Sequence, residues 1–166
     1  YLESTLAPKY RTGFDRNYWI WEEYQEGNTY LLAADIARGD GQDNSAFHVF
    51  KLETMEIVAE YVGKPTPDDY ADILFNAGKE YGSCMIVAEN NNIGFAVLKK
   101  LKDKGSDFIV LNYANEEGAG FDSTTNRVII YHQSIKFELS KDRKDRIAEK
   151  IISYVLKNSN SKKLIK

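Results

Sequence analysis

An aspartate set within an apolar run is the feature that most constrains how this chain folds. The segment Tyr30–Phe50 reads YLLAADIARGDGQDNSAFHVF, and it places Asp35 among aliphatic residues ahead of a turn rich in glycine and aspartate. A buried carboxylate without a partner is costly, or it takes up a proton. We therefore expect Asp35 to meet an arginine, a set of backbone amides or a metal ion.

Composition indicates one ordinary globular domain. The chain has 166 residues, of which 43% are hydrophobic and 28% charged, which excludes disordered and fibrous classes. No apolar run approaches the roughly 20 residues that cross a bilayer. The N-terminus also lacks the layout of a signal peptide. We expect a cytoplasmic protein without a membrane partner.

The residues available as metal ligands favour oxygen chemistry. Cys84 is the only cysteine, which excludes a disulfide framework and a zinc cluster. It lies in an apolar run and is interpreted as a small buried hydrophobe. His48 and His132 are isolated from each other and are interpreted as structural. Any metal would therefore be bound by carboxylates, which favours magnesium or manganese over zinc.

The hydrophobic pattern predicts an α/β domain. Three strands with short connections, an antiparallel meander, precede a helix, a strand, a second helix and a fifth strand. Thr66 is the expected N-cap of the first helix, which explains Asp68 and Asp69 without a metal. The predicted elements span residues 29–37, 46–52, 57–62, 67–81, 83–88, 93–104 and 108–111.

The two ends of the chain are less regular. Residues 1–28 are interpreted as an irregular lead-in that packs on a domain of residues 29–166. Residues 128–139 hold one or two short strands or irregular chain. From Ser140 we expect a basic amphipathic helix, in a region (136–166) of local charge +6 against −9 elsewhere. The apolar face of this helix would comprise Ile147, Ile151, Ile152 and Val155.

The predicted sheet brings two acids together. The strand that carries Asp35 and the strand that ends in Glu89 would lie side by side in a mixed sheet with helices on its faces. Alternatively, Asp35 bonds to turn amides and Glu89 pairs with Arg38 or a lysine. Both acids at neighbouring positions favour a two-metal site, in which divalent cations activate water and stabilise the leaving oxygen of a phosphodiester.

The segments AADIARGDGQDNSAFHVF and VAENNNIG resemble the nuclease domain of the large terminase subunit of tailed bacteriophages, within the ribonuclease H-like superfamily. The resemblance covers about residues 18–101. It implies a Mg²⁺- or Mn²⁺-dependent endonuclease that cuts concatemeric double-stranded viral DNA in the host cytoplasm. It also implies an upstream ATPase domain, and a portal or procapsid and a small terminase subunit as partners.

The resemblance implies roles for particular residues. Asp35 and Glu89 match the first two metal ligands and Asp43 an auxiliary acid, whereas Asp40 remains a turn residue. The third ligand of the family, an aspartate that opens a late helix, has no match, and alignment places it beyond Lys166. Asp142 and Asp145 are weak substitutes, so a chain truncated at this point would bind the metals poorly.

The sequence also bears on ATPase activity, on DNA contacts and on alternative functions. No G-x-x-x-x-G-K-[ST] phosphate loop occurs, so this chain is not expected to pump DNA by itself. Lys99, Lys100, Lys102 and the last helix are candidates for contacts with the DNA backbone. The alternatives are another ribonuclease H-like nuclease, such as a resolvase or transposase, and a non-catalytic docking module of a packaging motor.

Overall fold

The structure is a computed structural model that describes residues 7–37, 43–90, 94–113, 123–132 and 135–162. In these ranges the strands form one sheet with the order β1-β2-β5-β4-β3-β6-β7-β8-β9. The strands are β1 (Tyr10–Thr12), β2 (Tyr18–Ile20), β3 (Tyr30–Asp35), β4 (Ser45–Lys51), β5 (Glu56–Gly63), β6 (Met85–Asn90), β7 (Phe108–Tyr113), β8 (Thr125–His132) and β9 (Ile135–Arg143). The helices are η1 (Phe14–Arg16), α1 (Pro67–Glu80), α2 (Gly94–Asp103) and α3 (Lys144–Lys162).

The middle of the sheet mixes antiparallel and parallel strands, as predicted. β3 pairs antiparallel with β4, and β4 with β5, which makes the expected meander. β3 also pairs parallel with β6, and β6 parallel with β7. β8 and β9 continue the sheet in antiparallel orientation. The strand that carries Asp35 therefore lies at the junction of the antiparallel and parallel halves.

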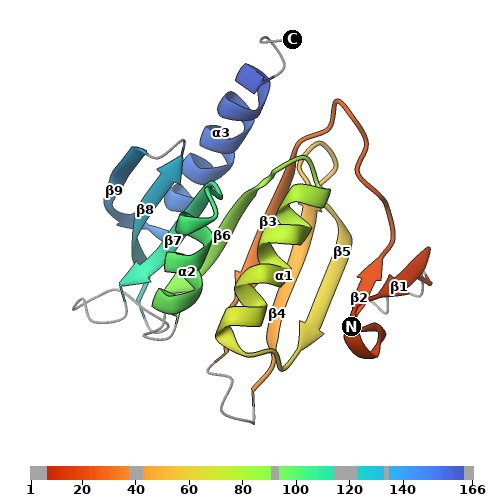
Figure 1. Cartoon of the computed structure of the whole chain (residues 1–166). Helices are drawn as coiled ribbons and strands as arrows, with labels where there is room; N and C mark the ends of the chain where they lie inside the picture. Colours follow the sequence, from red (N-terminus) through yellow and green to blue (C-terminus); the bar gives the residue numbers. More distant parts are fainter. Residues whose placement is uncertain (1–6, 38–42, 91–93, 114–122, 133–134, 163–166) are drawn as a thin grey trace.

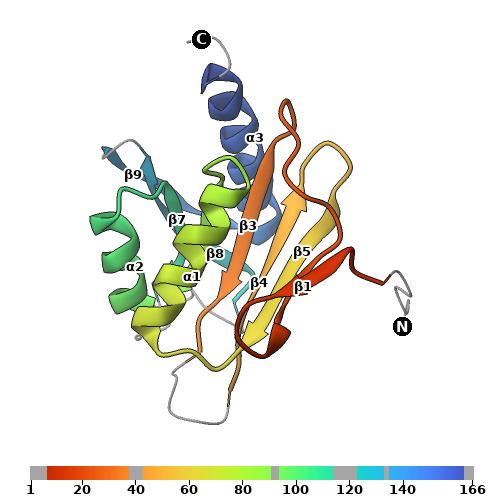
Figure 2. The ribbon, with the colours of Figure 1, turned by 45° about the vertical axis from the view of Figure 1, so that its right-hand side comes forward.

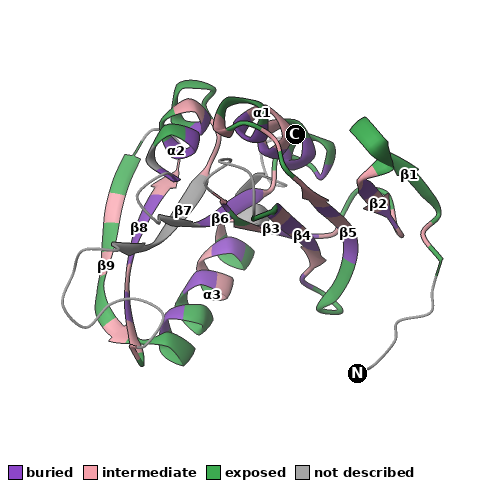
Figure 3. Ribbon diagram, turned by 90° about the horizontal axis from the view of Figure 1, so that it is seen from below, coloured by how far each residue is buried: buried purple, intermediate pink, exposed green. Residues whose placement is uncertain are grey.

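Helices cover both faces of this sheet (Figures 1 and 3). α1 and α2 lie on one face and α3 on the other. Successive residues of a strand point to opposite faces, so β3 and β6 contribute to two separate cores. Leu32 and Ile86 join the core under α1 and α2, whereas Leu31 and Val87 join the core under α3. None of the helices in the described part of the chain is long and apolar enough to cross a membrane.

The start of α1 agrees with the sequence prediction. Thr66 is its N-cap, and the Thr66 Oγ1 accepts a hydrogen bond of 3.2 Å from the Asp69 amide. The Thr66 hydroxyl also donates to the Asp69 carboxylate at 2.7 Å. Pro67 takes the first helical position, where its missing amide proton costs nothing. Asp68 and Asp69 thus lie in the first turn of a helix, as predicted.

The last helix starts later than predicted. Residues 140–143 extend β9, with Asp142 opposite Asn126 and Arg143 opposite Thr125. Pairing with β8 overrides the local helical pattern of this segment, because hydrogen bonds to a neighbouring strand satisfy its backbone. α3 then begins at Lys144 and buries much of the predicted face, namely Ile147, Ile151 and Val155, while Ile152 is half-buried.

The lead-in segment is more regular than the sequence indicates. β2 pairs antiparallel with β5, in the register Tyr18 to Tyr61, and β1 pairs with β2. Tyr18 is buried, and its ring meets Phe47 edge-on with centroids 5.4 Å apart. The expectation of irregular chain was wrong here, since a strand of three residues has almost no pattern of its own. Pairing with a distant strand forms it instead.

Candidate functional site

Two acidic positions meet at one edge of the sheet. Ala34 of β3 lies opposite Ala88 of β6 in parallel register. Asp35 and Glu89 follow these residues, so they occupy neighbouring positions where the two strands end. Adjacent strands lie about 4.8 Å apart. The predicted adjacency of these two positions is confirmed, and their role as metal ligands remains a prediction.

Asp35 is exposed, which corrects the expectation of a buried acid. It is the last residue of β3, and the chain beyond it leaves the sheet. The nearby Ala37 amide donates to Ser45 Oγ at 3.1 Å, so that turn amide is satisfied by a hydroxyl. Within the described part of the chain, the Asp35 carboxylate makes no hydrogen bond or ion pair. It thus presents free oxygen donors at the edge of the sheet.

Tyr70 of α1 supports this edge from the opposite face. Its side chain is fully buried, and its hydroxyl donates to the Ala46 carbonyl at 2.6 Å. Ala46 is the β4 residue directly opposite Asp35. Burial, and then the negative charge of Asp35, raise the pKa of the Tyr70 hydroxyl well above its ordinary value. The sequence places Tyr70 within the predicted helix 67–81 but does not reveal this support.

The auxiliary acid and its neighbours lie just outside the sheet. Asp43 is exposed and comes two residues before β4, on the side of the sheet where Asp35 ends. Asp40, expected as a turn residue, and Arg38, a possible partner of Glu89, lie outside the described residues. The placement of Asp43 is compatible with an auxiliary role, which remains a prediction.

The three lysines proposed to contact DNA lie on α2. Lys99 is exposed. Lys100 Nζ is 2.9 Å from an Asp72 carboxylate oxygen and also donates to the Asp68 carbonyl, so it links α2 to α1. Lys102 Nζ lies 5.5 Å from the centre of the Tyr131 ring. Lys100 is thus engaged by α1, and Lys102 lies near Tyr131, which pairs with Phe108 where β7 begins, at the edge opposite the acids. Contacts of these lysines with DNA remain a prediction.

The two weak candidates for a third ligand lie at the end of β9 (Asp142) and in the first turn of α3 (Asp145). Asp142 pairs with Lys150 at 2.7 Å, and this hydrogen bond is the main reason that its pKa is lowered. Asp145 pairs with Arg143 at 2.9 Å, which lowers its pKa in the same way. β9, which carries Asp142, is three strands from β6, or about 14 Å at ordinary strand spacing. Both carboxylates are thus engaged by basic side chains, and a role of either as third ligand remains a prediction.

The remaining candidate ligand types have structural roles, as expected. His48 Nε2 lies 3.0 Å from Glu60, and His132 Nδ1 lies 2.7 Å from the Tyr154 hydroxyl. Cys84 is a half-buried cysteine that packs beside the core under α1 and α2. No group of three or more His, Cys, Asp or Glu suited to a metal occurs among the described residues.

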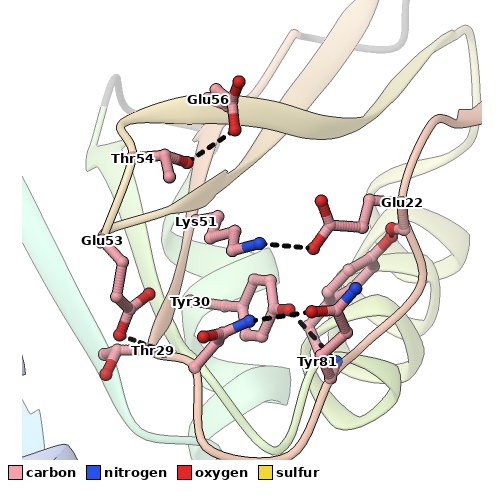
Figure 4. A network of polar contacts seen from close by, with 10 residues as sticks. Glu22, Thr29, Tyr30, Lys51, Glu53, Thr54, Glu56 and Tyr81 are labelled. Carbon is pink, nitrogen blue, oxygen red and sulfur yellow. Dashed lines mark hydrogen bonds and ion pairs between the residues drawn. The ribbon is translucent and has the colours of Figure 1, made fainter.

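The opposite edge of the sheet is closed by polar contacts (Figure 4). Lys51 pairs with Glu22 at 2.8 Å, and the Tyr81 hydroxyl donates to the Glu22 carbonyl at 2.7 Å. Beside this network is a cavity of about 380 Å³ whose lining includes Tyr30 and His132. It lies at the edge where β3 and β6 begin, so it is separate from the acids. We place the candidate site at Asp35 and Glu89 because carboxylates can bind the divalent cations that promote phosphodiester hydrolysis.

Comparison with protein families gives one match. A family described as the DNA/pantothenate metabolism flavoprotein C-terminal domain matches residues 42–158, well over half of the chain. By sequence profile, the chain belongs to this family. No curated protein matches the chain. The flavoprotein match begins after β3 and therefore omits the strand that carries Asp35.

Solved structures point to a different class of protein. The magnesium-bound nuclease of the large terminase of thermophilic phage G20c is 26% identical, with a TM-score of 0.57 over 67% of this chain and 57% of that one. Its zinc-bound form gives 26% identity and a TM-score of 0.56 over 66% and 61%. The large terminase nuclease domain of Thermus phage P74-26 gives 27% and 0.51 over 62% and 50%. The chain thus spans little more than half of these nucleases.

The flavoprotein match and the structural matches disagree, and the fold favours the nucleases. Domains that bind nucleotide cofactors at a switch point of the strand order use a mostly parallel, doubly wound sheet. Here β3, β4 and β5 form an antiparallel meander, and only the β3-β6-β7 portion is parallel. The predicted ribonuclease H-like mixed sheet is confirmed by the likeness to the G20c nuclease. The mixed sheet thus supports a nuclease more than a nucleotide-cofactor domain.

Proposed function

We propose that this domain is a divalent-metal-dependent endonuclease that cleaves double-stranded viral DNA during genome packaging in the host cytoplasm. One observation carries the proposal: Asp35 and Glu89 occupy neighbouring positions at the ends of the parallel strands β3 and β6. The fold that holds them is similar to terminase nucleases solved with magnesium, zinc or cobalt bound. A packaging role implies a portal, a small terminase subunit and an ATPase domain as partners.

The residues present fit a hard divalent cation. Asp35 offers an exposed carboxylate with no partner among the described residues. Glu89 supplies a second acid at the adjacent position, and two neighbouring carboxylates repel each other unless a cation lies with them. Oxygen ligands favour Mg²⁺ or Mn²⁺. When bound, such ions activate water and stabilise the leaving oxygen in phosphodiester hydrolysis.

The surrounding residues hold the acids in place. Ser45 accepts from the Ala37 amide, and Tyr70 donates to the Ala46 carbonyl, so the ends of β3 and β4 are fixed on both sides of Asp35. A nuclease that cuts at many sequences needs phosphate contacts more than base contacts. The exposed Lys99 and Lys102 are the candidates on α2.

The decisive test is nicking of supercoiled plasmid in Mg²⁺ or Mn²⁺. Asp35→Asn and Glu89→Gln should each lose about 100-fold or more of the wild-type rate, a loss on the scale of a missing electrostatic contact in the transition state. The matched control is Asp103→Asn, an exposed acid at the end of α2, which should keep the wild-type rate. Equal nicking by wild type and Asp35→Asn contradicts the proposal. So does the absence of nicking from both this chain and one extended past Lys166.

Metal binding gives a readout that does not depend on cleavage. Mn²⁺ should raise the thermal midpoint of the wild type by ligand linkage, and Asp35→Asn should lose most of that shift. Asp142→Asn and Asp145→Asn should retain it, because those carboxylates are paired with Lys150 and Arg143. Loss of the shift in Asp142→Asn or Asp145→Asn would instead identify the third ligand.

Further measurements separate the competing readings. A resolvase or transposase-like activity would show as a preference for branched over linear DNA. A docking module would show no cleavage and no metal-dependent shift. The flavoprotein match favours flavin binding as a second candidate, and titration with flavin mononucleotide, followed by its fluorescence, tests it. We expect no quenching, because the antiparallel meander does not provide a doubly wound nucleotide site.

A further inference from the structure

A turn near the N-terminus presents an unusually exposed aromatic side chain. Phe14 is 86% exposed, more than any other large hydrophobic side chain in the described ranges. It lies in the turn Gly13–Asn17, which contains η1 and which we call the aromatic turn. A single exposed hydrophobic residue is common on protein surfaces. The backbone conformation of this turn and its position at the edge of the sheet distinguish Phe14 from an ordinary exposed residue.

The aromatic turn is a defined structure. The Arg16 amide donates to the Gly13 carbonyl at 3.1 Å, and the Asn17 amide donates to the Phe14 carbonyl at 3.3 Å. Asp15 and Arg16 both have φ of 54°, a left-handed conformation that side chains disfavour. At Gly13, with φ of 80°, a Cβ would lie 2.8 Å from Asn17 Oδ1. Glycine is therefore required, and the backbone of the turn holds Phe14 outward.

The sheet places the aromatic turn at the edge that carries the acids. A row of paired residues crosses the sheet from Tyr18 through Tyr61 and Phe47 to Ala34. Asp35 follows Ala34 toward this edge, and the aromatic turn leads into Tyr18 from the same edge. Figures 1 and 2 show the turn, in dark red, beside the end of β5. β2 and β3 are three strands apart, or about 14 Å.

The charges around Phe14 suit a polyanion. Arg16 is exposed in the turn, and the exposed Arg11 guanidinium lies 4.5 Å from the centre of the Trp19 ring. Asp15 is the acid within the turn. A protein-docking site generally needs a contiguous apolar patch, whereas Phe14 stands alone among Thr12, Asp15 and Arg16. An isolated aromatic side chain with flanking arginines is the chemistry that stacks on or wedges between bases while meeting phosphates.

We propose that the aromatic turn contacts the DNA substrate beside the cleavage site, with Phe14 against a base step and Arg16 at a phosphate. This inference rests on the proposed nuclease function, since it assumes that the scissile phosphate lies at Asp35. The spacing between β2 and β3, about 14 Å, corresponds to about four base pairs at 3.4 Å per step. The turn would position the duplex without reading its sequence, because every base offers a face for stacking.

The test is the affinity for a fluorescent duplex of about 20 base pairs, measured by anisotropy in EDTA so that no cleavage occurs. Phe14→Ala should weaken binding about fivefold or more, and Phe14→Trp should restore it. Arg16→Gln should weaken binding to all sequences alike and lower the salt dependence by about one phosphate contact. The matched controls are Ile135→Ala and Lys136→Gln, exposed residues at the start of β9. Thermal melts establish that each variant is folded.

The result separates this inference from the proposed function. If Phe14→Ala and Arg16→Gln bind DNA as tightly as the two controls, the inference is overturned, even if Asp35→Asn abolishes nicking. If the turn variants lose affinity while neither the wild type nor the chain extended past Lys166 nicks DNA, the contact stands and the nuclease function fails. An unchanged DNA affinity combined with loss of a protein partner would assign the turn to protein docking and would also overturn the inference.

Discussion

At the scale of single residues, the Tyr70 hydroxyl is a specific support for the candidate site. It is fully buried and donates to the Ala46 carbonyl opposite Asp35. Tyr70→Phe should lower the free energy of unfolding by about 1 kcal/mol, the net worth of one such hydrogen bond. Urea unfolding measures this loss. Tyr24→Phe, at a side chain that is 42% exposed, serves as the control and should change little.

Buried tyrosines also predict how stability depends on alkaline pH. Burial is the main cause that raises the pKa of Tyr18, Tyr70 and Tyr81. In the unfolded chain a tyrosine titrates near pH 10. The folded state therefore holds these protons more tightly, so the stability they contribute is complete below about pH 10 and is lost as the pH rises further.

Urea unfolding at pH 9 and at pH 11 checks this prediction. The wild type should lose stability between these values, and Tyr81→Phe should lose less because one titrating hydroxyl is absent. Tyr24→Phe should behave like the wild type. A pH dependence that is unchanged in Tyr81→Phe would contradict the assignment to buried hydroxyls.

The candidate site could be predicted only in part from the sequence. The hydrophobic pattern predicts the strands and helices, and the adjacency of Asp35 and Glu89 was inferred from the mixed sheet that this succession of elements favours. The exposure of Asp35 could not be read from the run LLAADI, because apolar neighbours in sequence say nothing about where the strand ends. The hydroxyls of Ser45 and Tyr70 were missed because their partners lie on other elements.

At the scale of elements, the N-cap Thr66 stabilises the start of α1, the helix that follows the meander. Thr66 Oγ1 accepts from the Asp69 amide, which would otherwise lack a partner in the first turn. Thr66→Ala should cost about 1 kcal/mol of unfolding free energy. Thermal or urea unfolding measures it, with Thr12→Ala in the exposed β1 as a control. A loss no larger than that of the control would show that water replaces the cap.

The ion pair between Asp142 of β9 and Lys150 of α3 predicts that the stability of the fold decreases at acid pH. Lys150 lowers the pKa of Asp142 mainly through its hydrogen bond. A lowered carboxyl pKa gives stability that is present above the unfolded value, near 3.9, and is lost as the pH falls through the folded value. Asp142→Asn should melt below the wild type at pH 6, and the difference should close below pH 4. A difference independent of pH would point to packing instead of charge.

Element types were easier to predict than element boundaries. The meander, α1, β6 and α2 were predicted because their apolar residues recur with a clear period, and α1 also has the N-cap Thr66. β9 was partly taken for helix, since Ser140–Arg143 is polar and only its pairing with β8 makes it a strand. β1 and β2 were missed for the same reason. Pairing with strands distant in sequence determines the structure of these segments, and a single sequence does not show that pairing.

At the scale of the whole molecule, the lead-in is part of the sheet. β2 covers the edge of β5 and contributes the buried Tyr18 and Ile20 to the core. Deleting residues 1–20 should lower the thermal midpoint sharply and promote oligomers, because the uncovered β5 edge can pair with another chain. Melting and size-exclusion chromatography test this. A truncated monomer with the wild-type midpoint would show that the lead-in is dispensable.

If Asp35 binds a metal as proposed, its exposure has a consequence for which ion would occupy the site. A carboxylate at the surface imposes little cavity size or ligand geometry, and these are the means by which a site rejects the wrong ion. Occupancy would then follow the supply of free cations and the intrinsic affinity order, in which zinc and cobalt exceed manganese. The solved terminase nucleases with magnesium, zinc and cobalt are consistent with such tolerance. On the proposed function, abundance rather than selectivity would then decide which divalent cation occupies the site in a cell.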